Sequence, residues 1–510
     1  MSPAKLISIL LAASAVDMAS ASTTLTADNV ELTGSVQNGV VSYLGIPYAQ
    51  PPSGEWRWRA PRPLPMGEPV RNLGHFGPSC AQPYIEAMAD QNVDPEKTSE
   101  DCLYLNVWAP EDASDQPYPV MVWLHGGGFR IGGTGLELYN GEQLAREGVV
   151  VVTLNYRLGR LGFFAHPALQ QEDEATGNFG LLDQIQALRF VRKHIGTLGG
   201  DPGNITLFGE SAGGASVLYL MAAKQARGLF DKAIVQSGAI DMPELSRAEM
   251  AELASVFADN AGVAEASAEQ LRALPLETVL ATLPQGKTDT MPFIDGRLIE
   301  QSVYQAFERG EVAPVPLLIG SNDYEAGFFP PGFSLRVPDI MGPELWRQAQ
   351  AYADGYAQAS GVEAENDGHD TYAQAAQVAT DLFVTLGTRR VARAHAARGK
   401  PTYRYEFTYV PPGERNETLG AIHTADINYV FGNNLADDAD TQAMGRELRK
   451  RWVAFAKSGK PNDDDQPTWP TYGQDDETLL HFTPQGTRMG AESNAARLNF
   501  LESLGSLQIN

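Results

Sequence analysis

The chain has little cysteine, little positive charge and few metal-binding patterns. Its 510 residues include only two cysteines, and its 38 Lys and Arg are outnumbered by 63 Asp and Glu, which gives a net charge of −25. A nucleic acid or an anionic membrane would repel so acidic a surface, so neither is an expected partner. The eight histidines are scattered and the two cysteines are far apart. Because metal sites need ligands at characteristic short spacings, we expect neither a metal nor another cofactor.

Long hydrophobic runs are also missing, and the apolar run at the N-terminus is short. Lys5 is followed by an apolar stretch over 6–16 and then by the small residues Ala19, Ser20 and Ala21. A basic start, a short apolar core and an A-x-A site are typical of a secretory signal peptide. The run is too short to cross a bilayer as a helix, which needs about 20 residues. We therefore predict a cleaved signal peptide at 1–21 and a secreted or periplasmic protein without a stable membrane anchor.

Export bears on the two cysteines, Cys80 and Cys102. They are separated by 21 residues. An even, local pair in an oxidising compartment favours one disulfide bond. Closing a loop of this size contributes about 3 kcal/mol, mainly by restricting the unfolded chain.

Short apolar runs alternate with helical stretches along the first half of the chain. Such runs are typical of strands that are buried on both faces of a parallel sheet, and they lie at 120–124, 149–154, 205–208, 233–235 and 316–319. A later strand, 403–407, alternates apolar and charged residues, and a helix is expected over 181–195. Strands that alternate with helices predict a doubly wound α/β fold, with a central, mostly parallel, twisted sheet and helices on both faces.

Two regions, near 241–313 and 325–400, are mostly helical and carry no strand ladder of their own. Ser246 with Glu249 and Ser267 with Gln270 have the spacing of helix capping boxes. No linker separates these regions from the sheet. We therefore predict one domain over 22–510, with helical insertions above the carboxyl edge of the sheet.

One serine lies at a strand-to-helix junction that is flanked by glycine. The strand 205–208 runs into Gly209-Glu210-Ser211-Ala212-Gly213, and an apolar helix follows. A serine on such a tight turn needs small neighbours two residues away, because a Cβ there would clash. The turn lifts the hydroxyl above the sheet. This pattern predicts Ser211 as the nucleophile of an α/β-hydrolase.

A second glycine-rich turn follows strand 120–124. It reads His125-Gly126-Gly127-Gly128-Phe129. Ester hydrolysis passes through an oxyanion that is stabilised by preorganised N–H donors, and glycine lets the backbone approach it closely. We predict that the N–H groups of Gly127, Gly128 and Ala212 form an oxyanion hole.

A serine nucleophile needs a base and an orienting carboxylate, which follow it in the order acid, then histidine. Glu325 is the preferred acid and Asp323 the reserve, since both lie on a loop after strand 316–319. The candidate bases are His369 in a polar loop, His395 in a basic helical run that we expect to be solvated, His481 in an apolar stretch, and His423. His423 is the preferred base, although the residues alone leave the others open.

Taken together, these motifs resemble the type-B carboxylesterase family, which includes the cholinesterases and the bacterial para-nitrobenzyl esterases. The resemblance covers nearly the whole mature chain and rests on the two glycine-rich turns and on Tyr43–Ala49, Glu100–Val107, Asn155–Gly159, Asn178–Gln184, Gly199–Pro202, His423–Gly432 and Trp452–Asn462. It implies the α/β-hydrolase fold and a triad of Ser211, Glu325 and His423. It also implies that Cys80 pairs with Cys102, and that Glu210 and Ser237 orient the triad. One departure is Ala326, where the family usually has glycine directly after its acid.

The resemblance implies a serine carboxylesterase that forms an acyl-enzyme on a small-molecule ester. Residues 81–101 contain no tryptophan, whereas cholinesterases use one in this loop to bind choline, so a choline ester is not the expected substrate. The alternative is a specialised hydrolase of bulky or tertiary-alcohol esters or of polyesters, because the three glycines resemble those of esterases that accept hindered, tertiary-alcohol esters. A second, less favoured alternative is a non-catalytic binding protein on the same fold, although this chain lacks no member of the triad.

Overall fold

The computed structural model describes residues 21–503 with the exception of 28, 86–92, 113–115, 171–176, 240–243, 282, 284–288, 330–340, 342–345, 348–368, 416–417, 463–465 and 474–475. The predicted signal peptide, apart from its last residue, and part of the predicted 325–400 insertion lie outside the described residues. No described helix is long and apolar enough to cross a membrane.

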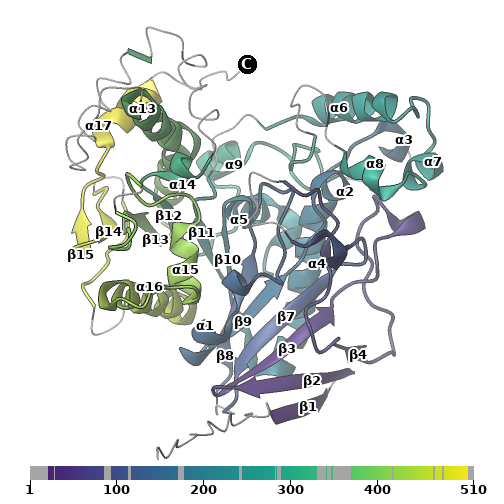
Figure 1. Cartoon of the computed structure of the whole chain (residues 1–510), viewed down its shortest axis with the longest axis horizontal. Coiled ribbons are helices and arrows are strands. Elements are labelled where there is room, and N and C mark those ends of the chain that lie inside the picture. The colour runs from purple at the N-terminus through teal and green to yellow at the C-terminus, as the bar shows by residue number, and fades with distance from the viewer. Residues whose placement is uncertain are drawn as a thin grey trace, which may run out of the picture.

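A 13-stranded sheet forms the centre of the molecule (Figure 1). Its strands lie in the order β1-β2-β3-β7-β9-β8-β10-β11-β12-β13-β14-β15, and β4 pairs with β2. The strands are β1 Ala21–Ala27, β2 Val30–Gln37, β3 Val40–Pro47, β4 Val70–Arg71, β7 Tyr104–Pro110, β8 Tyr118–Leu124, β9 Val150–Leu154, β10 Gly200–Glu210, β11 Lys232–Gln236, β12 Leu317–Asn322, β13 Thr402–Phe407, β14 Leu479–Thr483 and β15 Gly486–Gly490. A separate two-stranded sheet pairs β5 Ser79–Cys80 with β6 Thr98–Ser99.

The middle of the large sheet is parallel and its two ends are antiparallel. From β9 to β14 every neighbouring pair is parallel. The pairs from β1 to β9, and the pair β14–β15, run antiparallel. The predicted mostly parallel α/β sheet is therefore confirmed, and the five predicted apolar strands are β8 to β12.

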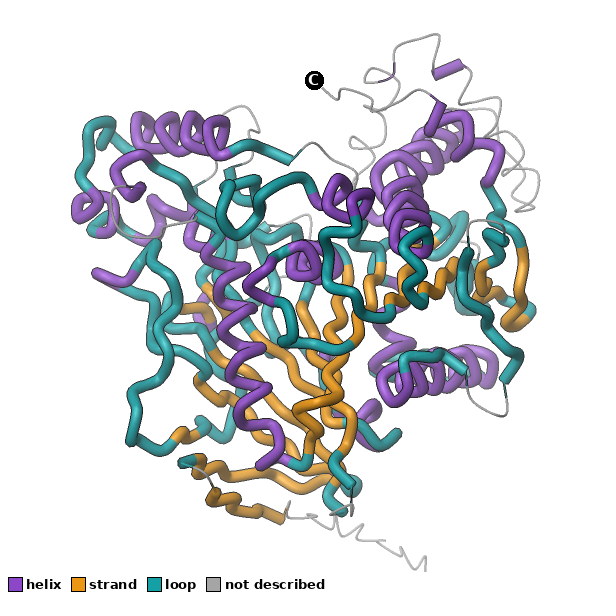
Figure 2. Tube along the Cα trace, turned by 180° about the vertical axis from the view of Figure 1, so that it is seen from behind, coloured by secondary structure: helices purple, strands orange, loops and turns teal. Residues whose placement is uncertain are grey.

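Helices cover both faces of this sheet (Figures 1 and 2). The α-helices are α1 Glu142–Arg146, α2 Gly159–Gly162, α3 Pro167–Gln170, α4 Phe179–His194, α5 Ala212–Ala222, α6 Arg247–Asn260, α7 Ala268–Arg272, α8 Leu276–Leu280, α9 Val303–Arg309, α13 His369–Thr380, α14 Leu386–Ala396, α15 Ala425–Phe431, α16 Ala439–Ser458 and α17 Ala495–Ser503. In β8, Val122 and Leu124 belong to the core that includes α4 and α5, whereas Met121 and Trp123 belong to the core of α15 and α16. Burial on both faces explains why these strands are apolar throughout.

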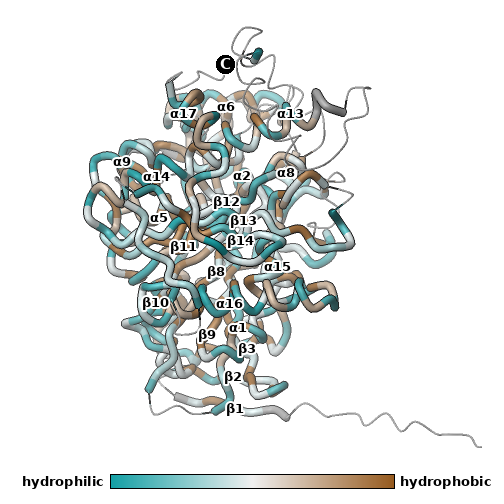
Figure 3. Tube along the Cα trace, turned by 90° about the vertical axis from the view of Figure 1, so that its left-hand side faces the viewer, coloured by the Kyte–Doolittle hydropathy of each residue, from teal (hydrophilic) through white to brown (hydrophobic). Residues whose placement is uncertain are grey.

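The two predicted insertions contain the expected helices in their described parts. α6, α7, α8 and α9 lie in the first, and both capping boxes, at Ser246 and at Ser267, form as predicted. α13 and α14 lie in the second and are joined by a π-helix, Asp381–Thr385. Figure 3 shows α6 and α13 at the end of the molecule that is opposite β1, and Figure 1 shows that they lie on different sides of that end. The division into one domain with insertions stays a prediction.

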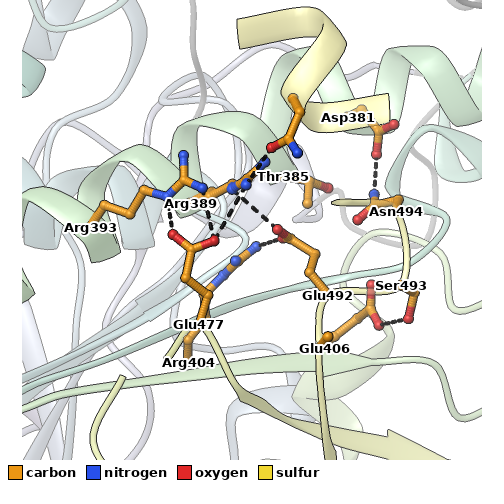
Figure 4. A network of polar contacts seen from close by, with 12 residues as sticks. Asp381, Thr385, Arg389, Arg393, Arg404, Glu406, Glu477, Glu492, Ser493 and Asn494 are labelled. Carbon is orange, nitrogen blue, oxygen red and sulfur yellow. Dashed lines mark hydrogen bonds and ion pairs between the residues drawn. The ribbon is translucent and has the colours of Figure 1, made fainter. Parts of the chain in front are cut away.

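His395, in the basic run of α14, is buried, so the prediction that it is solvated is wrong. His395 is 1% exposed and its Nδ1 lies 2.8 Å from the Thr402 hydroxyl. Arg389, on the same helix, is also buried and faces the carboxylates of Glu477 and Glu492 (Figure 4). The positive charges of this helix are evident from the sequence. Their pairing with acidic side chains from the C-terminal part of the chain is not.

Buried polar partners, Glu492 among them, explain the alternating pattern of β13. Every residue of this strand is buried, including its two charged ones. Arg404 pairs with Glu492, and Glu406 accepts hydrogen bonds from His481 and Ser493 (Figure 4). Buried charges persist when they are paired and hydrogen-bonded. β13 is therefore a central strand whose polar residues have partners.

The predicted disulfide bond between Cys80 and Cys102 is present, with Cα atoms 4.9 Å apart. Replacing both cysteines with alanine should lower the free energy of unfolding by about 3 kcal/mol, because the unfolded chain regains loop entropy. Urea unfolding of the oxidised protein and of the variant measures this difference. A variant as stable as the oxidised protein would contradict the expectation.

Candidate active site

Ser211 lies between the end of β10 and the start of α5. Its backbone has φ 55° and ψ −124°, an uncommon conformation for a residue other than glycine. The N–H of Ser211 donates to the carbonyl of Gln236 on β11 at 2.9 Å, which fixes the turn against the neighbouring strand. Such strain persists only where the surroundings impose it, and it is concentrated at functional sites.

The glycines on either side of Ser211 leave no room for a side chain. A Cβ on Gly209 would come within 2.5 Å of the carbonyl carbon of Gly213. A Cβ on Gly213 would come within 1.9 Å of the carbonyl oxygen of Leu124. Both positions therefore require glycine, for the steric reason that the sequence pattern indicated.

The second glycine-rich turn packs against the first. A Cβ on Gly126 would come within 2.8 Å of the Glu210 carboxylate and within 3.2 Å of the Ser211 Cβ. Gly127 and Gly128 both have positive φ, 104° and 60°. Within the described residues, the N–H groups of Gly127, Gly128 and Ala212 donate no hydrogen bond. Three unused donors thus lie on the two turns that meet at Ser211.

The structure brings His423 against Glu325. The Nδ1 atom of His423 lies 2.6 Å from Oε2 of Glu325, although the two residues are 98 positions apart. The other carboxylate oxygen of Glu325 accepts the backbone N–H of Asn322 at 2.7 Å, at the carboxyl end of β12. Both side chains are buried. Glu325 is therefore oriented by the end of a central strand.

Asp323, the reserve candidate for the acid, has a different partner. Its Oδ1 accepts the backbone N–H of Ala421 at 2.8 Å. This bond ties the loop after β12 to the loop that carries His423. In the structure Asp323 supports a loop, while Glu325 contacts the imidazole.

Glu210 faces the other side of the imidazole. Its Oε1 lies 3.2 Å from Nε2 of His423, and the carboxylate is 1% exposed. Among the described residues the Ser211 hydroxyl makes no hydrogen bond to His423. Bonds between nucleophile and base are often long without substrate and shorten in the complex.

The carboxylates around His423 favour its protonated form. Burial lowers the pKa of this imidazole, but Glu210, Glu325 and Asp426 outweigh burial and raise the pKa to about 9. Burial also raises the pKa of Glu210 to about 8, against the opposing effect of His423. The two groups face each other and titrate as a pair.

Several groups around His423 were not predicted from the sequence. Phe328 and Phe329 directly follow the acidic loop, and both rings lie 5.7 Å from the imidazole ring. The carboxylate of Asp426 accepts hydrogen bonds from Gln236 and Tyr405, both at 2.9 Å. Asp426 stands three residues after His423 and belongs to the motif His423–Gly432. Nothing in the sequence indicates that Gln236 and Tyr405 are its partners.

Ser237 and the other candidate histidines form no hydrogen bond with His423 in the described part of the chain. Ser237 is buried and has φ 49°, and its hydroxyl has no hydrogen-bond partner among the described residues. The structure thus does not join Ser237 to the histidine. His481 is buried and bonded to Glu406, and the side chain of His369 lies outside the description. In the described part of the chain no cluster of three or more His, Cys, Asp or Glu could hold a metal ion.

A mostly parallel sheet with a serine on a tight turn after a central strand defines the α/β-hydrolase class. The comparisons with known proteins agree with this class. The model of the "Carboxylesterase family" matches residues 21–501. The chain is 34% identical to the para-nitrobenzyl esterase of Bacillus subtilis over 473 residues, 88% of this chain and 92% of that protein. It is 32% identical to the fumonisin B1 esterase of Sphingopyxis macrogoltabida, over 89% and 86% of the two chains.

A solved structure of PNB esterase has a TM-score of 0.78 and 31% identity, and the match covers 94% of this chain and 99% of that one. The chain therefore belongs to the type-B carboxylesterase family and is a carboxylic ester hydrolase.

Proposed function

We propose that the chain hydrolyses carboxylic esters through an acyl-enzyme on Ser211, with His423 as the base and Glu325 as its orienting acid. The observation that carries this proposal is the contact of 2.6 Å between His423 and Glu325, on an imidazole that also lies 3.2 Å from Glu210, the residue directly before Ser211. A buried carboxylate at Nδ1 holds the imidazole in the tautomer whose Nε2 accepts a proton.

In the first half of the reaction, Ser211 Oγ attacks the ester carbonyl carbon while His423 takes the hydroxyl proton. The carbonyl oxygen becomes an anion that the N–H groups of Gly127, Gly128 and Ala212 bind. When the tetrahedral intermediate collapses, the carbon–oxygen bond to the alcohol breaks, and the alcohol leaves with the proton of His423. Water then repeats these steps on the acyl-enzyme, releases the carboxylic acid and restores Ser211.

Hydrolysis of hindered esters is the second candidate. A Cβ on Gly128 would meet no atom within 4 Å, so the backbone of the glycine-rich turn borders open space there. This open space favours a site that accepts a bulky ester. We also propose that the chain is exported, on the basis of its N-terminal pattern.

The rate of hydrolysis should increase with pH through a midpoint above the ordinary histidine value of 6.5, because His423 must lose its proton to act as a base and the facing carboxylates raise its pKa. The measurement is kcat/KM for a p-nitrophenyl ester between about pH 5 and pH 10. Glu210→Gln removes one facing charge, so it should shift the midpoint to lower pH. A midpoint that stays in place in this variant would contradict the assignment.

A fluorophosphonate probe tests the proposed function directly. The probe phosphonylates an activated serine as fluoride leaves, so the protein should lose activity in proportion to labelling, and peptide mapping should place the label on Ser211. A non-catalytic binding protein would remain unlabelled. Labelling at another serine would overturn the assignment of the nucleophile.

A further inference from the structure

The side-chain amide of Gln82 makes three backbone hydrogen bonds. Its Nε2 donates to the carbonyl oxygens of Gly132 and Cys80, each at 2.8 Å. Its Oε1 accepts the N–H of Gly132, also at 2.8 Å. One amide thus satisfies both backbone polar groups of Gly132, as a neighbouring strand would. Gln82 is 7% exposed, so water cannot easily replace these bonds.

Gly132 in turn supports the turn that carries the proposed oxyanion donors. It has φ 111°, and a Cβ there would come within 2.6 Å of the His125 ring and 2.8 Å of the Gly126 carbonyl oxygen. The carbonyl of Gly127 accepts the N–H groups of Arg130 and Ile131 at 3.0 and 3.1 Å, which closes the turn. Gly132 therefore lies against the residues that immediately precede Gly127.

The other end of this connection is the disulfide loop. Gln82 stands two residues after Cys80, which is bonded to Cys102. A second amide runs parallel to the first, since Asn155 donates to the carbonyl of Pro78 at 3.0 Å and accepts the N–H of Thr134 at 3.0 Å. The segments 78–82 and 132–134 are thus joined by two buried amides, next to a covalent cross-link.

We propose that Gln82 is a positioning residue for the oxyanion-binding turn: it ties Gly132 to the backbone of Cys80, beside the disulfide bond, and so holds the N–H groups of Gly127 and Gly128 in place. This inference rests on the proposed function. An oxyanion hole acts because its donors are already in place when the charge develops. Donors that can move lose part of that advantage, and a displacement of about 1 Å can cost about 100-fold in rate.

The test compares two buried glutamines. Gln82→Met keeps the size of the side chain but removes all three hydrogen bonds. The matched control is Gln186→Met, because Gln186 on α4 is also buried and donates to a backbone carbonyl, that of Tyr48, at 3.4 Å. Both variants should lose stability. Only Gln82→Met should lower kcat, by about 10- to 100-fold, with KM nearly unchanged, because the ground state does not need the donors.

A trifluoromethyl ketone separates positioning from stability. Its adduct with the serine carries an oxyanion, so its affinity should decrease in Gln82→Met by the same factor as kcat/KM and stay constant in Gln186→Met. A lower melting temperature with unchanged kcat and inhibitor affinity would overturn the proposal. If Gln82→Met does not fold, Gln82→Asn keeps an amide that is too short for all three bonds, and it should give a smaller loss of the same kind. Labelling of Ser211 in the wild-type protein tests the proposed function independently of either variant.

Discussion

Replacing Ser211 with alanine should lower kcat for a p-nitrophenyl ester by about 10⁵-fold, because the acyl-enzyme can no longer form. The change removes a single oxygen that makes no hydrogen bond among the described residues, so the fold should keep its stability. Residual hydrolysis should remain above the rate in water, since the N–H donors still stabilise the oxyanion of a direct attack by water. The measurement is kcat by absorbance, together with the melting temperature.

The matched control for this variant is Ser255→Ala on α6. The Ser255 hydroxyl donates to the carbonyl of Ala251 within its own helix, at 2.9 Å. Its loss should leave kcat unchanged. If Ser211→Ala keeps near-normal turnover while its fluorophosphonate labelling is lost, the acyl-enzyme mechanism is wrong.

Replacing Glu325 with glutamine should lower kcat by about 10³- to 10⁴-fold. An amide has nearly the same shape, and its oxygen can still accept the N–H of Asn322. It carries no charge, however, so it cannot stabilise the imidazolium that forms when His423 takes the proton. An amide N–H directed at Nδ1 also favours the wrong tautomer of the imidazole. The protein should therefore fold normally and fail in the chemical step.

Asp323→Asn is the control for Glu325→Gln, because the two acids lie on the same loop. The amide oxygen of asparagine can still accept the N–H of Ala421. We expect a change in kcat of less than about tenfold, since Asp323 supports the loop and it is Glu325, not Asp323, that places its charge at Nδ1 of His423. A larger loss in Asp323→Asn than in Glu325→Gln would reverse the assignment of the two acids.

Some predictions from the sequence depend only on local chemistry, and these agree with the structure. The strand-to-helix turn at Ser211 follows from glycine at 209 and 213, where any Cβ would overlap backbone atoms. The capping boxes at Ser246 and Ser267 need only residues three positions apart. The apolar runs of β8 to β12 reflect burial on both faces of one sheet. Each of these signals lies within a few residues of the feature it predicts.

Other features were not readable, because their partners are far away in the sequence. The basic run in α14 was expected to be solvated, yet its Arg389 and His395 are buried, and Arg389 faces Glu477, which lies 88 positions further along the chain. Gln82 stands in an ordinary polar stretch, and only its contact with Gly132, 50 residues later, gives it a role in the proposed mechanism.

The sequence by itself determined the parallel strands β8 to β13, the two glycine-rich turns and the serine, since backbone geometry and burial on both faces of a strand act between near neighbours. Only the tertiary structure decided that Glu325, and not Asp323, contacts His423, a pair 98 residues apart. That contact depends on how the loops after β12 and β13 meet at one edge of the sheet. Both acids occupy the same loop in the sequence, and only the direction of each side chain in the folded chain distinguishes them.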